Sequence, residues 1–230
     1  MKVAIDLHIH SALSPCGDDD MTPNNIVNMA ILNGLDAIAV TDHNSCDNVE
    51  AVMKVAEGRI LVIPGMELQT REEVHLLSYF NDLSSLISFS NELLPFFDGL
   101  SNSPSFFGHQ WIINELDEIT GEMDQALLTS LSISLDDAVE LIRRHKGIAV
   151  PAHVNKSSYS ITSQLGFLPS YLNFRMLEYS QYHEMNFSDF PRCNFIFSSD
   201  AHSLGQILDR TMLISVDDLS IDGILEALSK

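Results

Sequence analysis

The sequence is poor in positive charge. It has 12 lysines and arginines against 32 aspartates and glutamates, and its formal net charge at pH 7 is −20. Binding to the backbone of long nucleic acid depends on Lys and Arg side chains that neutralise phosphates, so this composition argues against long nucleic acid as a partner. We expect a solvated acidic surface. Divalent cations held inside the protein would offset part of the formal charge.

Cysteine and long apolar segments are also scarce. The three cysteines, Cys16, Cys46 and Cys193, cannot all pair with one another. No apolar run approaches the ~18 residues of a membrane-spanning helix, and the N-terminus lacks the charged and apolar regions of a signal peptide. We therefore expect reduced thiols in a cytoplasmic protein that has no membrane partner.

No glycine-rich phosphate loop follows a predicted strand, which removes the usual argument for a nucleotide-binding open sheet. Short apolar strands instead alternate with helices, beginning with a strand over 1–10 and a helix that starts at Thr22-Pro23 and stops at Asn33-Gly34. Further strands are expected at 35–40, 59–63, 73–80, 147–153, 174–179, 194–199 and 211–216, and further helices at 46–57, 134–147 and 220–228. This pattern predicts a single α/β domain over 1–230, folded as a barrel of parallel strands with right-handed crossovers.

Residues from about 82 to 133 interrupt this alternation. Apolar residues predict one helix over 86–97, and the segment 106–130, which holds Trp111, predicts another helix and a linker. We interpret the interruption as a helical elaboration near the mouth of the barrel. It would act either as a lid over the substrate or as extra packing.

The first strand carries metal-ligand side chains on one face. Its sequence, MKVAIDLHIH, alternates between apolar residues and a polar face with Asp6, His8 and His10. Histidines at i and i+2 lie roughly 6.7 Å apart at Cα, near enough for both rings to reach one cation. Asp6 would then fix the tautomer of a histidine from behind. The alternative is a pair of partly exposed histidines on an edge strand.

Further side chains of the same kinds stand at the carboxyl ends of later predicted strands. These are His43, Glu67, His153, Asp200 and His202, whereas His75 lies inside a predicted strand and would have to point inward from a bend. The carboxyl ends of parallel strands in a barrel share one rim, where active sites are built. The gathering of histidines and acids there predicts a metal site.

Six short motifs occur in a recognisable order: DLHIHS, TDHNS, PGMEL, VHLLSYF, PAHV and SSDAHS. In this order the chain resembles the PHP (polymerase and histidinol phosphatase) superfamily over nearly its whole length except 82–133. The resemblance implies a distorted (β/α)7 TIM-like barrel with a cluster of two or three divalent cations at the carboxyl ends of its strands. Zinc, manganese or iron would be the metal, and a phosphoesterase would be the activity.

The resemblance also implies a ligand set. The first metal would be held by His8, His10, Glu67 and Asp200. Glu67 would bridge to a second metal held with His75 and His153, and His43 and His202 would hold a third. The loop after His10 is expected to add one ligand, and its candidates are Cys16, Asp18 and Asp20. Cys16 has the spacing at which the family uses histidine, but Asp20 is favoured because hard or borderline cations prefer oxygen and imidazole.

Such a centre predicts hydrolysis of a phosphate ester of a small molecule or nucleotide. Two cations ~3.5–4 Å apart activate a shared water and clamp both reacting oxygens. Glu67, Asp200 and His202 are the predicted catalytic residues, and His202 would stabilise the leaving oxygen. Lys156, three residues after His153, is the predicted phosphate-binding cation; a solvated lysine is the alternative.

Two other functions fit the same residues. A metal-activated water also attacks carbonyl carbon, so the chain could be an amidohydrolase or a cyclic-ester hydrolase. It could also be a metal-loaded sensor of a nucleotide or phosphometabolite without turnover, although a sensor would not need every ligand. The sequence leaves the metal, the substrate and the oligomeric state open.

Overall fold

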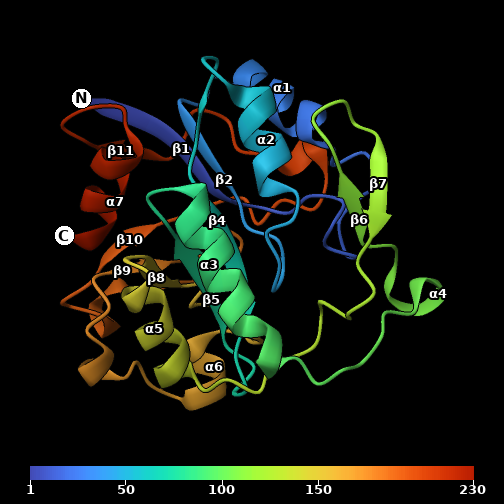
Figure 1. The fold of residues 1–230 in the computed structure, drawn as a ribbon. Coiled ribbons are helices and arrows are strands. Elements are labelled where there is room, and N and C mark those ends of the chain that lie inside the picture. Colours follow the sequence, from blue (N-terminus) through green and yellow to red (C-terminus); the bar gives the residue numbers. More distant parts are fainter.

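A computed structural model describes residues 1–230 as a mixed α/β fold. Strand β1 (Lys2–Ile9) lies between β2 (Ala37–Val40) and β11 (Leu213–Ser215), and β3 (Leu61–Val62) completes a four-stranded sheet. The pairs β1–β2 and β2–β3 are parallel, whereas β11 is antiparallel to β1. Helices α1 (Pro23–Leu32) and α2 (Val49–Ala56) connect the parallel strands and lie together at one edge of the molecule (Figure 1).

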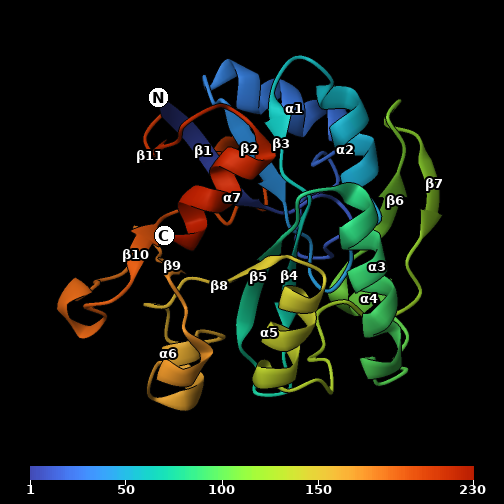
Figure 2. The same cartoon turned by 60° about the vertical axis from the view of Figure 1, so that its left-hand side comes forward.

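A second sheet is antiparallel and has the order β4-β5-β8, with β4 at Gly65–Gln69, β5 at His75–Tyr79 and β8 at Ile148–Pro151. Strands β9 (Met176–Glu178) and β10 (Asn194–Ile196) form a parallel pair. Figure 2 shows these groups of strands around a shared centre, with α5 (Leu135–Arg144), α6 (Ile161–Leu165) and α7 (Ile221–Ser229) outside them. Short 3-10 helices occupy Leu94–Phe96, Ser170–Leu172, Phe187–Asp189 and Leu204–Gln206.

No closed barrel is present, so the prediction of a (β/α)7 barrel is not confirmed. The strands form separate hydrogen-bonded sheets, and β4, β5 and β8 pair antiparallel. The reason lies in the connection between β4 and β5, where residues 70–74 are too few for a crossover helix. A connection this short joins strands only as a hairpin.

The segment 82–133 also differs from its prediction. The first expected helix is present as α3 (Leu83–Leu93), but 106–130 contains no second long helix. It holds the end of the one-turn helix α4 (Pro104–Phe107) and an antiparallel hairpin of β6 (Trp111–Ile113) and β7 (Ile119–Glu122). Figure 1 shows this hairpin on the side of the molecule opposite the two chain ends.

Helices α1 and α5 begin at the capping residues from which their starts were predicted. The Thr22 side chain accepts a hydrogen bond from the amide of Asn25 at the start of α1, and the Ser134 side chain accepts one from Asp137 at the start of α5. Pro23 follows the first cap and needs no amide partner. None of the helices is long and apolar enough to cross a membrane.

The hydrophobic core joins the separate sheets. Ile5 of β1, Leu77 of β5 and Val150 of β8 belong to one buried cluster that α7 completes with Ile224 and Leu225. A second cluster fills the space between the β4-β5 hairpin and helices α3 and α5. Because the sheets share this packing, the strand ends that carry the polar residues are held in a fixed relation.

Candidate metal centre

The side chains of Glu67 and five histidines meet at the middle of the structure. One oxygen of Glu67 lies 2.9 Å from Nδ1 of His75 and 3.3 Å from Nε2 of both His8 and His153. The other oxygen lies 3.0 Å from Nδ1 of His43 and 3.5 Å from Nε2 of His10. Glu67 comes from β4, and the histidines come from four other parts of the chain.

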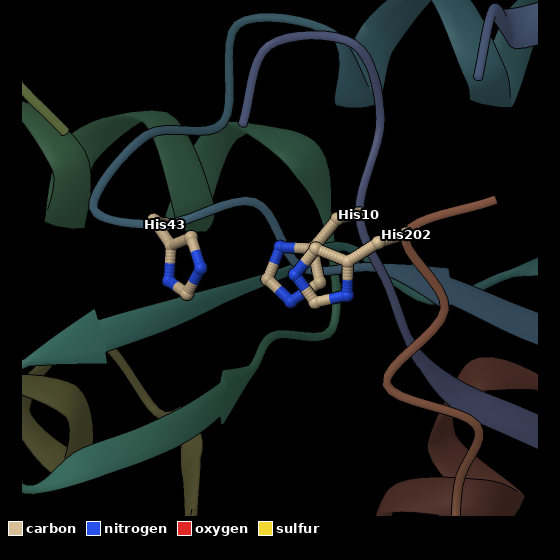
Figure 3. Close-up of side chains that lie close together, drawn as sticks. All are labelled: His10, His43 and His202. Carbon is tan, nitrogen blue, oxygen red and sulfur yellow. The ribbon is translucent and has the colours of Figure 1, made fainter. Parts of the chain in front are cut away.

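Asp200 and His202 join this cluster from the loop after β10. The carboxylate of Asp200 lies 3.2 Å from Nε2 of His10 and 3.4 Å from Nε2 of His8. The ring of His202 stacks on that of His10 with centroids 4.4 Å apart, and His43 lies at the same distance on another side of His10 (Figure 3). All eight residues named for the metal cluster other than Asp20 are therefore brought together.

Several buried polar atoms in the cluster lie close to one another and yet form no hydrogen bond of acceptable geometry. They are both carboxylate oxygens of Glu67 and the Nδ1 atoms of His43, His75 and His153. Buried polar atoms are almost always satisfied, so atoms that converge without bonding require another partner. Divalent cations fit this requirement, because imidazole nitrogen and carboxylate oxygen are ligands of zinc and related metals.

The cluster contains three groups of three residues, and within each group the ligand atoms lie within 4.8 Å of one another. They are His8, His10 and Asp200; His43, Glu67 and His75; and His10, His43 and His202. Each triplet is compact enough for one cation, and the shared residues His10 and His43 tie the triplets into a single centre. The residues thus fit a centre of more than one metal.

His75 reaches the cluster by a route that the sequence did not suggest. It is the first residue of β5 and pairs with Gln69 at the end of β4. Because the two strands are antiparallel, the amino end of β5 lies beside the carboxyl end of β4. No bend in the strand is needed, and His75 faces Glu67 directly.

The loop after His10 brings Cys16 to the centre and not Asp20. Asp20 is exposed, and its backbone carbonyl accepts a hydrogen bond from the Asn25 side chain. Although Cys16 borders solvent, its thiol contacts the rings of His43 and His202. The structure therefore does not bring Asp20 to the cluster, whereas Cys16, in the turn that the Gly17 amide closes on the Ser14 carbonyl, lies beside it.

Glu178 is a site residue that the sequence analysis missed. Its carboxylate lies 3.0 Å from Nδ1 of His8 and accepts a hydrogen bond from the amide of His153 at 3.0 Å. Glu178 thus takes the part expected of Asp6, whose own carboxylate accepts from the amides of Ser199 and Leu208. Its position near the carboxyl end of the strand predicted at 174–179 was the signal that could have found it.

His10 is oriented by a buried polar chain. Its Nδ1 lies 3.0 Å from the hydroxyl of Ser14, which donates to Asp42 at 2.7 Å. Asp42 also accepts from the amide and hydroxyl of Ser11. Such partners fix the ring of a metal-binding histidine.

The electrostatics of the centre favour ionised carboxylates. Burial alone would raise the pKa of Glu67, but the adjacent His75 and His8 hold it well below its usual range. Burial would likewise raise the pKa of Asp200, which His8 and a hydrogen bond from His10 lower. Both carboxylates are thus ready to bind cations at neutral pH.

The pKa values of the histidines at the centre shift in opposite directions. Burial would lower the pKa of His43, yet Glu67 and Cys16 raise it to about 10. For His75 the effect of burial exceeds the attraction of Glu67, and the pKa falls to about 4. The two rings share one carboxylate, Glu67, which favours the protonated form of only one of them. Bound cations would supply the positive charge in place of that proton.

A cavity of about 280 Å³ opens beside the cluster. His153, Asp200 and His202 form part of its wall, and so does Lys156, whose ammonium pairs with Asp200. Lys156 thus lies at the wall of the cavity beside the centre, in contact with Asp200.

Residues 6–154 match a model of the PHP domain. Curated proteins gave no match. Among solved structures, the chain is similar to a lesion-specific endonuclease Q from Pyrococcus furiosus, with a TM-score of 0.74 and 19% identity over 100% of this chain and 56% of the other. It is also similar to endonuclease Q bound to a 27-mer duplex substrate with an abasic lesion at the active site, with a TM-score of 0.76 and 20% identity over 99% of this chain and 56% of the other.

A third similar structure is a protein from Bifidobacterium adolescentis that is described as a metal-dependent phosphoesterase. Its TM-score is 0.64 at 16% identity, over 97% of this chain and 95% of the other. The present chain thus matches that protein over almost its full length, but it spans only 56% of the endonuclease Q chains.

The prediction that excluded long nucleic acid as a partner is wrong. A chain of similar fold has been solved with a DNA duplex as its substrate. The argument failed because net charge sums the whole surface, whereas contact with phosphate depends on the charges near the site. A net charge of −20 is compatible with a local phosphate site where Lys156 and bound cations would stand.

Proposed function

This chain belongs to the PHP domain family, and from that membership we propose that it is a metal-dependent hydrolase of phosphate esters. The observation that carries the proposal is Glu67, a buried carboxylate within 3.5 Å of five histidine nitrogens and without a hydrogen bond. We further propose that residues 1–230 act as one domain, because the ligands come from both ends of the chain.

We assign the ligands in three groups. His8, His10, Glu67 and Asp200 would hold a first cation; Glu67, His75 and His153 a second; His43, His202 and Cys16 a third. The compact triplets support this division. Zinc, manganese and iron each suit a set of imidazole and carboxylate ligands.

When bound, the cations would supply an activated water and offset the charge of the phosphate. The chain's own residues would do the rest. Lys156 would bind a phosphate oxygen from the wall of the cavity, and Asp200 would hold Lys156 in place. His202 borders the same cavity and, together with the cation that it would hold, would stabilise the departing oxygen. Glu178 and Ser14 would keep the rings of His8 and His10 in position.

Elemental analysis of the protein as purified, together with an activity panel, tests the proposal. The panel contains phosphomonoesters, phosphodiesters and amides, assayed with added Mn²⁺ or Zn²⁺. We expect bound transition metal and hydrolysis of a phosphate ester, with loss of at least about a hundredfold in His8→Ala. Glu226→Gln, an exposed carboxylate in α7, is the control and should leave activity unchanged. Absence of metal, or hydrolysis of amides alone, would contradict the proposal.

Cleavage of a DNA strand at a damaged site is a second candidate. It is favoured by the similarity to endonuclease Q in complex with a duplex that has an abasic lesion. The experiment is incubation of the chain with a labelled duplex, with and without an abasic site, in the presence of each metal. Cleavage of the lesion-containing duplex alone would support this candidate. Hydrolysis of small esters without cleavage of either duplex would favour a small substrate.

A further inference from the structure

A cavity of about 710 Å³ lies apart from the metal cluster, between residues 162–175 and residues 189–193. Its walls lead into the amino ends of the parallel strands β9 and β10. Glu178 and Asp200, which belong to the metal centre, follow the carboxyl ends of the same strands. We call this space the β9–β10 cavity. Its volume lies within the ~300–1,000 Å³ typical of sites for small molecules.

The β9–β10 cavity has an apolar body. Phe174 is buried and closes its base, whereas Phe167 is 60% exposed and Phe190 is half-buried beside it. Leu168 adds a further apolar wall. Exposure of an apolar surface to water is unfavourable in free energy. A concave apolar surface therefore favours binding of a flat or aliphatic ligand that displaces the water.

The polar part of the cavity is formed by two arginines. Arg175 and Arg192 line it, and neither guanidinium forms an ion pair or a hydrogen bond within the chain. In contrast, Arg71, Arg144 and Arg210 each pair with a carboxylate. Both arginine side chains are exposed to solvent, so their donors are open to an incoming anion.

One carboxylate in the cavity offsets part of this charge. Asp189 lines the cavity as well, and it also accepts a hydrogen bond from the Asn186 side chain at 2.9 Å. Cys193 lines the cavity too; burial raises the pKa of its thiol, and the charge of Arg175 opposes that shift. The cavity thus keeps an excess of positive charge next to apolar walls.

We propose that the β9–β10 cavity binds a small organic anion with an apolar body. The apolar part of the ligand lies on Phe167, Phe174 and Phe190, and its anionic group lies between Arg175 and Arg192. Planar guanidinium groups bind carboxylate, sulfonate and phosphate oxygens in pairs. The inference does not rest on the proposed function, because none of these residues belongs to the metal centre.

Fluorescence titration with anilinonaphthalene sulfonate tests the site. This probe has an aromatic body and one anionic group, and phenylnaphthylamine is its neutral counterpart. We expect one binding site, with affinity for the sulfonate at least about tenfold above that for the neutral compound. The double variant Arg175→Gln/Arg192→Gln should weaken sulfonate binding by at least about tenfold. Arg71→Gln, which removes an exposed arginine elsewhere, should leave binding unchanged.

Cys193 provides a second readout in the same cavity. The bound sulfonate should slow alkylation of Cys193 by maleimide, followed by mass spectrometry of its peptide, without slowing that of Cys46. Circular dichroism checks that the double variant is folded, and the single variant Arg192→Gln replaces it if it is not. Equal binding by the variants and the wild type, or no protection of Cys193, would overturn the proposal. Dimers that separate on addition of the probe would overturn it in favour of a second copy as occupant.

Discussion

At the scale of single residues, Glu178 orients the ring of His8 within the cluster. It bonds Nδ1 of His8 and leaves Nε2 of that ring to face Glu67 and Asp200. The same carboxylate holds the backbone amide of His153. One side chain thus holds the ring of His8 and the backbone at His153, and its effect on metal binding is expected to exceed that of a distant surface charge.

Replacement Glu178→Gln should weaken metal affinity by ten- to a hundredfold. The amide keeps the size of the side chain but loses the negative charge and presents a donor to His8. Competition with a chromogenic chelator measures the affinity for Zn²⁺ or Mn²⁺. Glu226→Gln, at an exposed carboxylate, is the control. Unchanged affinity in Glu178→Gln would show that His8 is positioned without it.

Cys16 should be the most reactive thiol of the metal-free protein. Hydrogen bonds from His202 and His43 outweigh the effect of burial and lower the pKa of Cys16 to about 7, whereas burial raises that of Cys46 to about 12. At pH 8 Cys16 is mostly thiolate, so iodoacetamide should label it well before Cys46. The rate should fall as the pH is lowered through about 7.

Added Zn²⁺ should protect Cys16 from this labelling if the thiolate joins the third group of ligands. Cys16→Ser should then lower the number of bound metal ions, while Asp20→Asn should not. Peptide mass spectrometry and elemental analysis give the two readouts. Loss of metal in Asp20→Asn with none in Cys16→Ser would restore Asp20 as the loop ligand.

At the scale of elements, the β6–β7 hairpin is attached to the metal-bearing loops by Asn48. The Asn48 side chain donates to the Ser11 hydroxyl and to the carbonyl of Trp111, both at 3.0 Å, and accepts from the amide of Ile113 at 2.8 Å. Ser11 in turn bonds Asp42, which bonds Ser14 beside His10. The hairpin therefore supports the cluster through a continuous polar chain.

Asn48→Ala should lower the free energy of unfolding by about 2–3 kcal/mol, because it leaves the buried amide of Ile113 and its neighbours without partners. Urea denaturation followed by circular dichroism measures the loss. Asn91→Ala, at an exposed position of α3, should change stability by less than about 0.5 kcal/mol. A loss no larger in Asn48→Ala than in this control would mean that the hairpin is held by other contacts.

At the scale of the whole molecule, the cluster joins the two ends of the chain. His8 lies on β1, His10 directly follows it, and Asp200 and His202 follow β10, so a cation held between them closes the fold. In the absence of cations, the charges of Glu67 and Asp200 are balanced only by the surrounding histidines and Lys156. Metal binding is thus expected to contribute to the stability of the entire chain.

Metal removal should lower the thermal midpoint. A cation present at a hundred times its dissociation constant stabilises the folded state by about 2.7 kcal/mol. Scanning fluorimetry of the protein with EDTA, Mn²⁺ or Zn²⁺, at matched ionic strength, measures the shift. His8→Ala should show a much smaller increase with metal than the wild type. An equal midpoint with EDTA and with every metal would argue against a resident metal.

Much of the site could be predicted from the sequence because its signals are local. A strand with period two places His8 and His10 on one face, and short apolar strands bring His43, His153 and Asp200 to their carboxyl ends. Helix caps such as Thr22 and Ser134 depend on a few neighbouring residues. The motifs also gave the PHP family correctly, since its residues are read directly from the chain.

The tertiary structure alone decided the rest. The hairpin of β4 and β5 places His75 beside Glu67, and the turn after His10 brings Cys16, and not Asp20, to the rings of His43 and His202. Glu178 gains its role through His8, which lies 170 positions away in the chain. Strand direction, loop conformation and contacts between distant residues depend on the packing of the whole core, which no pattern within a short segment determines.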